Sequence, residues 1–355
     1  MAGSVLIHTE DEQLLDDLLR LCAAAGAAAD VVHGGPVPAA QWERAPLVLV
    51  GDDRAAAGGP GTGSRRPGVL LIGRDLDDHT VWARGVALGA EHVLHLPGDE
   101  PWLADRIADA VEDTGPPALT LGLLSGCGGA GGSTLACALA LASARQGRPT
   151  LLIDGDPLGG GLDVLLGAEE TTGLRWPALA SSRGRLPATA LQEALPEVRG
   201  VRLLSWDRSD AARLSAEAMR SVLTAARRRG GAVIIDLPRA ADPAAAEALA
   251  QLDLGLLVAP PGLRALLASR RVADGAGVAV RDLRAVARRT GAGRNSAEER
   301  ARLLGLPLAG EVPEEPGLSD AAESGEPPGA DPSSPLARFC ATLLDRALPV
   351  AGAAS

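Results

Sequence analysis

A glycine-rich loop between an apolar strand and an alanine-rich helix constrains the fold of this chain more than any other feature. The loop reads SGCGGAGGST over residues 125–134, after the apolar segment Leu119–Leu124 and before a helical pattern that continues to Arg145. Backbone amides of such a loop, together with a helix N-terminus, can surround phosphate oxygens. A working phosphate loop also carries a lysine as a point charge, and Gly132 stands at that place. The sequence therefore predicts the backbone of an anion site without its usual cation.

Composition excludes several classes of function. All 34 basic residues are arginine, and tyrosine is absent. The five histidines lie in the first hundred residues, so acid–base chemistry in the rest of the chain must use Asp, Glu or Cys. The net charge of -11 argues against nucleic-acid binding and against adhesion to anionic membranes. No apolar run approaches the ~20 residues of a membrane span. Four scattered cysteines without a CxxC pair indicate a reduced, cytoplasmic setting.

The pattern of apolar segments predicts two α/β domains. Short apolar strands alternate with helical patterns over residues 1–112, and residues 113–118 are predicted to be a linker. Residues 119–350 form the second domain, a doubly wound parallel sheet that binds ligands at the carboxyl ends of its strands. Within it, residues 311–335 are acidic and rich in proline and glycine, which predicts a loop or tether. Residues 336–348 are predicted to form a last helix with one apolar face. We expect this helix to pack on the domain, because its polar face is too weakly basic for a membrane anchor.

We expect the later strands of the second domain in apolar runs that alternate with helices. These runs are 150–153, 201–204, 232–235, 254–258, 278–280 and 308–312.

Two ligand classes share the glycine pattern of the loop. The spacing Gly126-x-Gly128-x-x-Gly131, with Asp154 ending the next strand, also fits a dinucleotide site. The pair Ser133-Thr134 and a later apolar strand that ends in Asp236 favour a nucleoside triphosphate site with a metal ion. The second domain also lacks His, Lys and Tyr for a proton relay, so an NAD-binding oxidoreductase is the less favoured interpretation.

Three motifs in order resemble one superfamily. Residues 125–134 are similar to the deviant Walker A motif of MinD/ParA proteins, and residues 153–163 resemble the acidic motif of their CpaE/TadZ branch. Residues 235–239 and 257–260 match later strands of the same group, so the resemblance covers about residues 118–350. It implies a P-loop NTPase-like fold.

The first domain resembles the receiver domain of response regulators, on the segment 89–94. The family's phosphorylated aspartate would end the third strand, where Gly51 stands with Asp52 one place late, and Leu96 occupies the position of its lysine. Glu10-Asp11-Glu12 could supply the acidic pair. We therefore predict a pseudo-receiver, a module for docking or dimerisation.

The superfamily resemblance assigns roles to individual residues of the second domain. Backbone amides would wrap the phosphates of ATP or ADP at Gly128, Gly129, Ala130, Gly131, Gly132, Ser133 and Thr134. Ser133 and Asp236 would hold Mg²⁺, and Asp154 would support the metal shell. Asp156 would position the attacking water.

The same resemblance shows what is missing. The family's signature lysine is Cys127 here, the Walker lysine is Gly132, and the adenine-contacting asparagine falls near Arg281-Asp282. Arg239, directly after the second apolar motif, is the predicted substitute cation. We expect either Mg²⁺ with ATP or ADP, or no cofactor, and no efficient hydrolysis.

The predicted function is a CpaE/TadZ-like positioning scaffold with little or no catalysis. It would form a homodimer in the cytoplasm and recruit septum proteins or Flp/Tad pilus-secretion proteins at a pole, a septum or the inner face of the membrane. Nucleic acid is not an expected partner, and membrane contact would be peripheral at most. The alternative is an ATP/ADP-dependent dimer switch with slow ATPase activity.

Overall fold

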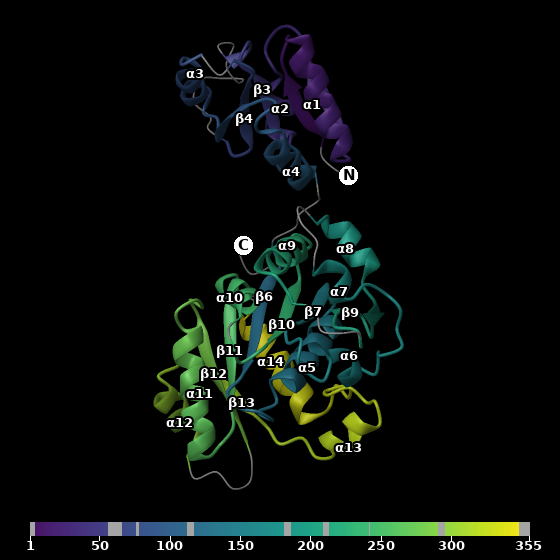
Figure 1. The fold of residues 1–355 in the computed structure, drawn as a ribbon, viewed down its shortest axis with the longest axis vertical. Coiled ribbons are helices and arrows are strands. Elements are labelled where there is room, and N and C mark those ends of the chain that lie inside the picture. The colour runs from purple at the N-terminus through teal and green to yellow at the C-terminus, as the bar shows by residue number, and fades with distance from the viewer. Residues whose placement is uncertain are drawn as a thin grey trace. The chain divides into compact units, whose positions relative to one another are not determined.

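The chain divides into two compact units, residues 1–113 and 114–355 (Figure 1). The computed structural model describes residues 4–55, 66–75, 78–111, 117–180, 186–208, 213–240, 242–289 and 295–347. Most of the predicted linker, residues 113–116, therefore lies outside the described residues.

The first unit is a five-stranded parallel sheet with strand order β2-β1-β3-β4-β5. Its strands are β1 (Val5–His8), β2 (Ala29–Val32), β3 (Val48–Gly51), β4 (Val69–Gly73) and β5 (His92–His95). Its helices are α1 (Glu12–Ala24), α2 (Ala39–Arg44), α3 (Val81–Leu88) and α4 (Glu100–Val111). This order is the flavodoxin-like arrangement of receiver domains. The sequence pattern missed β2 because this edge strand is only half-buried and lacks a continuous apolar run.

The second unit is an eight-stranded sheet with strand order β13-β12-β11-β6-β10-β7-β9-β8. All pairs are parallel except β8 with β9. The strands are β6 (Leu119–Ser125), β7 (Thr150–Asp154), β8 (Glu197–Val198), β9 (Val201–Leu204), β10 (Ala232–Leu237), β11 (Leu254–Ala259), β12 (Leu283–Arg288) and β13 (Leu308–Val312). Because β6 lies between β10 and β11, the loop that follows it begins at the middle of the sheet edge.

Helices cover both faces of this sheet (Figure 1). They are α5 (Gly132–Arg145), α6 (Leu162–Leu165), α7 (Trp176–Leu179), α8 (Ala188–Ala194), α9 (Ala216–Arg227), α10 (Pro243–Ala250), α11 (Leu263–Ala276), α12 (Ala297–Leu304), α13 (Leu318–Glu323) and α14 (Pro335–Ala347). Two buried clusters form the core: one lies under α9 to α12 and the other under α5 and α14.

Two predictions about elements of the second unit are wrong. No strand forms at 278–280, where Val278 is 90% exposed; the strand in this part of the chain is β12. Its sequence LRAVAR carries arginines at the partly solvated positions Arg284 and Arg288, so the apolar run is short. Residues 311–335 are also not a loop or tether throughout, because the helix α13 forms within them. Their first two residues end β13, in agreement with the predicted run 308–312.

The last helix packs on α5 as expected. Leu336, Cys340, Leu343 and Leu344 of α14 are buried in the same cluster as the alanines of α5. None of the helices in the described residues is long and apolar enough to cross a membrane.

Truncation of Leu344 tests the contribution of α14 to the stability of the second unit. Leu344 is 1% exposed, so Leu344→Ala should lower the free energy of unfolding by about 2–4 kcal/mol through lost burial and a residual cavity. Leu303→Ala is the matched control, because Leu303 is 56% exposed and should change stability by less than about 0.5 kcal/mol. Urea unfolding followed by circular dichroism measures both. Equal losses in the two variants would contradict the docking of α14.

Candidate phosphate-binding site

The loop after β6 has a backbone that only glycine adopts easily. Gly129 has φ +72° and Gly131 has φ +96°, both in the left-handed region. The Gly126 amide donates to the Val258 carbonyl of β11 at 2.9 Å, and a Cβ at Gly126 would lie 2.0 Å from Ser269 Oγ of α11. The glycines therefore allow the loop to approach α11 and then to begin α5 at Gly132.

A serine hydroxyl lies where a lysine side chain would begin. The Gly132 amide donates to Ser125 Oγ at 3.2 Å. A Cβ built on Gly132 would lie 2.4 Å from that oxygen, so any side chain there requires Ser125 to rotate. With Ser125 in this position, only glycine fits at residue 132 without a rearrangement.

A cavity of about 720 Å³ opens beside the loop. This size is within the range of small-molecule sites. Six predicted site residues line it: Gly129, Ala130, Gly131, Gly132, Ser133 and Thr134. The other wall comes from Val258, Arg288, Arg289 and the segment 312–318, with Asp320 and Leu336.

Several other predicted residues lie outside that wall. They are Gly128, Asp154, Asp156, Asp236 and Arg239. Arg239 is exposed, and its role as the substitute cation stays a prediction. Asp156 is half-buried and accepts a hydrogen bond from the Leu158 amide at 3.0 Å.

Asp236 lies behind the loop, beside the start of α5. It is 6% exposed, and a hydrogen bond joins it to the Ser133 side chain. Burial raises the pKa of Asp236 to about 7, although the bond with Ser133 opposes the shift. The two residues predicted to hold Mg²⁺ are therefore adjacent, and the carboxyl is partly protonated near neutral pH.

Asp154, its in-register neighbour on β7, organises the protein rather than facing the cavity. Its carboxylate accepts from the Leu162 amide at 3.0 Å and from Ser205 Oγ at 2.9 Å, and its carbonyl accepts from the indoles of Trp176 and Trp206 at 2.6 and 3.1 Å. Burial raises its pKa to about 6. This engaged carboxylate does not favour a dinucleotide site, where it would bind a ribose.

The residues present therefore fit a magnesium nucleotide in part. The loop amides, Ser133 and Asp236 have the chemistry to hold phosphate and a water-bound metal ion. The two lysine positions, Cys127 and Gly132, supply no charge. Among the described residues, no group of three or more His, Cys, Asp or Glu side chains could hold a metal by itself.

Arg288 is the site residue that the sequence pattern missed. Its Nη1 donates to the Gly129 carbonyl at 3.0 Å and lies 3.5 Å from that of Ala130. The sequence pattern placed this strand at 278–280, with the residues that follow it at Arg281-Asp282, whereas β12 runs from Leu283 to Arg288. The signal available in the sequence was the apolar run Ala285–Ala287, which precedes Arg288 directly.

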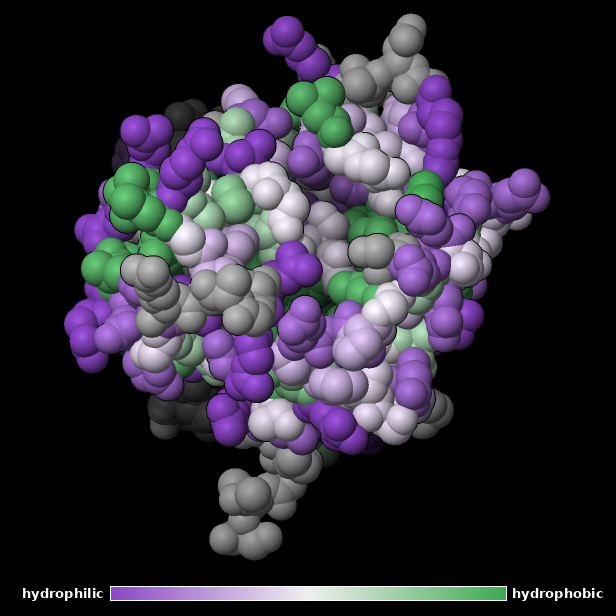
Figure 2. Space-filling model, turned by 90° about the horizontal axis from the view of Figure 1, so that it is seen from below, coloured by the Kyte–Doolittle hydropathy of each residue, from purple (hydrophilic) through white to green (hydrophobic). Residues whose placement is uncertain are grey.

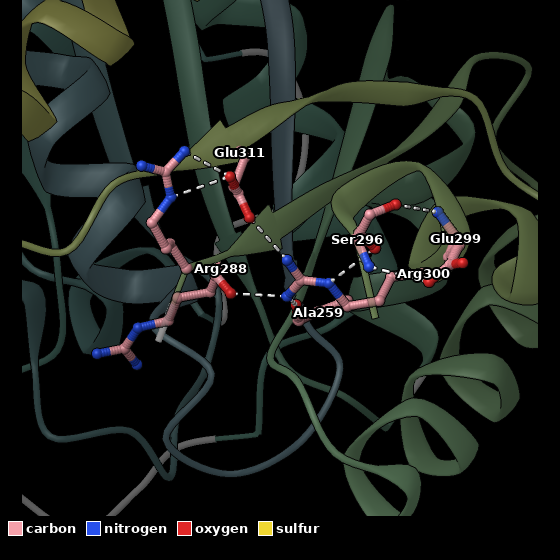
Figure 3. Close-up of polar contacts among 7 residues, drawn as sticks. Ala259, Arg288, Ser296, Glu299, Arg300 and Glu311 are labelled. Atoms are coloured by element: carbon pink, nitrogen blue, oxygen red, sulfur yellow. Dashed lines mark hydrogen bonds and ion pairs between the residues drawn. The ribbon is translucent and has the colours of Figure 1, made fainter. Parts of the chain in front are cut away.

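A buried arginine holds the strand end that carries Arg288 (Figure 3). Arg300 is 3% exposed; its Nη1 donates to the Arg288 carbonyl at 2.6 Å and its Nη2 to Glu311 Oε1 at 2.9 Å. Arg289 donates to Glu311 Oε2 through Nε and Nη2, at 3.0 and 2.7 Å. Figure 3 shows the Arg288 side chain pointing away from this network.

In the first unit, arginines pair with the acidic residues of the receiver-like site. Arg54 forms an ion pair with Glu10, and Arg84 lies 3.7 Å from Asp52. Asp53 accepts hydrogen bonds from Thr9 Oγ1 and the Glu10 amide, both at 2.7 Å. The carboxylates of this site therefore already have hydrogen-bond or ion-pair partners within the protein. In this respect the site differs from one whose carboxylates are available to bind Mg²⁺.

Two details of this unit explain why it is not arranged as a phospho-acceptor. A Cβ at Gly51 would lie 2.2 Å from Asp53 Oδ1, so an aspartate does not fit there without rearrangement. Asp11, part of the predicted acidic pair, instead caps α1 by accepting from the amides of Gln13 and Leu14.

The fold and the site define a two-unit chain with a receiver-like unit followed by a P-loop unit of the MinD/ParA type. The family described as "Rv3660c-like, CheY-like N-terminal domain" matches residues 8–118. Two Mycobacterium tuberculosis sequences, both uncharacterised and named MT3760 and Rv3660c, are 37% identical over 323 residues, covering 89% of this chain and 90% of theirs. The chain therefore belongs to the Rv3660c-like family.

Solved structures share the fold of the second unit. A ParA family ATPase from Chlorobium tepidum matches with a TM-score of 0.56 at 18% identity, covering 64% of this chain and 98% of that one. The septum site-determining protein MinD from Pyrococcus horikoshii, solved with Mg-ADP, matches with 0.56 at 21%, covering 66% and 98%. MinD from Aquifex aeolicus, in complex with MinC, matches with 0.52 at 23%, covering 66% and 98%.

The raised pKa of Asp236 predicts how stability depends on pH. Because the carboxyl has a pKa of about 7 when folded and 3.8 as the ordinary value, the folded chain binds more protons between these values, and its contribution to stability falls as pH rises through this window. Asp236→Asn should remove that loss and be more stable than the parent by at least ~1 kcal/mol at about pH 8, since each pKa unit corresponds to about 1.4 kcal/mol.

Chemical denaturation from about pH 5 to about pH 8 measures this difference. Asp274→Asn is the control, because that carboxylate is 62% exposed. A parent and an Asp236→Asn variant with parallel pH profiles would contradict the raised pKa.

Proposed function

We propose that this chain is a MinD/ParA-type positioning scaffold of the CpaE/TadZ-like kind, which dimerises and recruits partners without efficient ATP hydrolysis. The observation that carries the proposal is a phosphate loop whose backbone is kept while both lysine positions are empty, at Cys127 and Gly132. The proposed partners are septum proteins or Flp/Tad pilus-secretion proteins, reached from the cytoplasm at a pole, a septum or the inner face of the membrane.

Electrostatics supports the loss of hydrolysis. Phosphoryl transfer depends on positive charge placed where negative charge develops, and one such group typically contributes several kcal/mol. The loop lacks both lysines, so its own residues supply no such charge. Slow ATP-dependent switching is the second candidate, and the position of Arg288 on the loop favours it.

Exposed leucines support dimerisation at the edge that carries the loop. Leu158 follows β7 and is 88% exposed, while Leu263 and Leu267 follow β11 and are 74% and 58% exposed. Since parallel strands end at one edge, the segments that carry these leucines begin at the same edge of the sheet as the loop. Figure 2 views the chain from that side and shows hydrophobic patches among hydrophilic groups. Apolar groups surrounded by polar ones are typical of interaction surfaces.

Charge substitution tests the proposed dimer surface. Leu158→Asp and Leu263→Asp should each weaken self-association by at least about tenfold, because a carboxylate would have to be desolvated in the interface. Val278→Asp is the matched control: Val278 is 90% exposed and precedes β12, at the opposite edge of the sheet. Sedimentation over a concentration series gives the dissociation constants. A monomeric parent, or an equal effect of all three changes, would refute the surface.

Restoration of the loop cation tests whether the empty lysine position limits nucleotide binding. Gly132→Lys should raise affinity for Mg-ATP by about tenfold or more, since a lysine there supplies a charge-assisted contact to phosphate. Gly132→Met has similar length and meets the same Ser125 hydroxyl, so it controls for the steric change. Isothermal calorimetry compares the two. If Lys and Met behave alike, the empty lysine position is not what limits nucleotide binding.

A further inference from the structure

The fold brings a cation to the loop from another strand. We propose that Arg288 supplies the positive charge that the loop itself lacks, so that the cavity binds the phosphate groups of a small phosphorylated ligand without hydrolysing it. This inference rests on the proposed function in taking the site as non-hydrolytic, and it adds a ligand to the scaffold.

Arg288 is the residue whose guanidinium reaches the loop. It lines the cavity, and a Cβ built on Gly131 would lie 3.6 Å from its Nη1. Both bonds to the loop carbonyls of Gly129 and Ala130 use Nη1, whereas a guanidinium carries further donors on Nε and Nη2. The group is therefore anchored through one nitrogen beside the N-terminus of α5, where it can present its other donors to an anion.

The neighbouring arginines have other tasks. Arg289 also lines the cavity, but it donates two hydrogen bonds to Glu311. Arg300 is buried and bonds to Glu311 and to the Arg288 carbonyl. Glu311 balances these two cations, and Arg300 fixes the strand end from which the Arg288 side chain extends.

The opposite wall determines which phosphate ligands the cavity favours. Glu314, Glu315 and Asp320 line it, and Glu315 accepts a hydrogen bond from the Leu336 amide at 2.9 Å. Carboxylates oppose a bare polyanion and favour one that carries its own divalent cation. The chemistry thus fits a magnesium complex of a di- or triphosphate, either as a nucleotide or as free pyrophosphate.

Calorimetry with the full chain tests the assignment, using Mg-ATP, Mg-ADP and Mg-pyrophosphate at up to millimolar concentration. At least one of them should bind the parent. Arg288→Ala should weaken that binding by about tenfold or more, equivalent to ~1.4 kcal/mol. Arg288→Lys should recover part of the affinity because it keeps the charge. Equal affinity for all three probes would identify the phosphates as the ligand, and tighter binding of ATP and ADP would identify a nucleotide.

The matched control is Arg284→Ala, which removes the same charge from the same strand, where Arg284 pairs with Asp282 away from the loop. It should bind like the parent. The salt dependence of binding separates charge from structure, since Arg288→Ala should flatten it and Arg288→Lys should not. A parent that binds none of the probes, or an Arg288→Ala variant that binds within twofold of the parent, would overturn the proposal. Either result leaves the non-hydrolytic scaffold itself standing.

Discussion

The parallel pairing of β6 with β10 and β11 is the constraint on which the rest of the second unit depends. Register places Asp236 opposite Leu123 on one side of β6 and Val258 opposite Ser125 on the other. The chain therefore leaves the sheet at its centre, between a buried carboxyl and an apolar strand end. The loop, the start of α5 and Arg288 all lie at this edge of the sheet.

This edge has the backbone geometry of a phosphate site, but its positive charge is not on the loop. The loop has left-handed glycines at Gly129 and Gly131, but its own lysine positions are empty. The chain has no lysine, so its strongly basic side chains are all arginine. The Arg288 side chain reaches the loop from β12, and Arg300 holds the end of that strand by donating to the Arg288 carbonyl.

The sequence predicted the local parts of this arrangement better than the relations between them. Motifs that are contiguous in the chain, such as residues 125–134 and the strand ending near Asp236, identified the P-loop fold and the place of the loop. Arg288 escaped prediction because its importance arises from strand pairing across the sheet, and because an arginine-bearing strand lacks the apolar run that marks β11. Asp154 has the right position for a ligand contact, yet its carboxylate is used by Leu162 and Ser205, which no local pattern reveals.

The same logic applies to the receiver-like unit. Its fold follows from short apolar strands, whereas the pairing of Arg54 with Glu10 depends on contacts between distant loops. Near this edge of the first unit, Glu10 and Asp52 pair with arginines, and in the second unit Asp154 and Asp236 are buried. These observations support the proposed scaffold over a phosphotransfer switch or an efficient ATPase.

The most direct test of that account is ATP turnover by the purified full chain, compared with an Asp156→Ala variant. The family resemblance assigns to Asp156 the positioning of the attacking water, so hydrolysis of the family's kind would depend on it. A non-hydrolytic scaffold should release no phosphate above background, and the variant should show the same background rate. Turnover that is clearly above background and is lost in Asp156→Ala would contradict it.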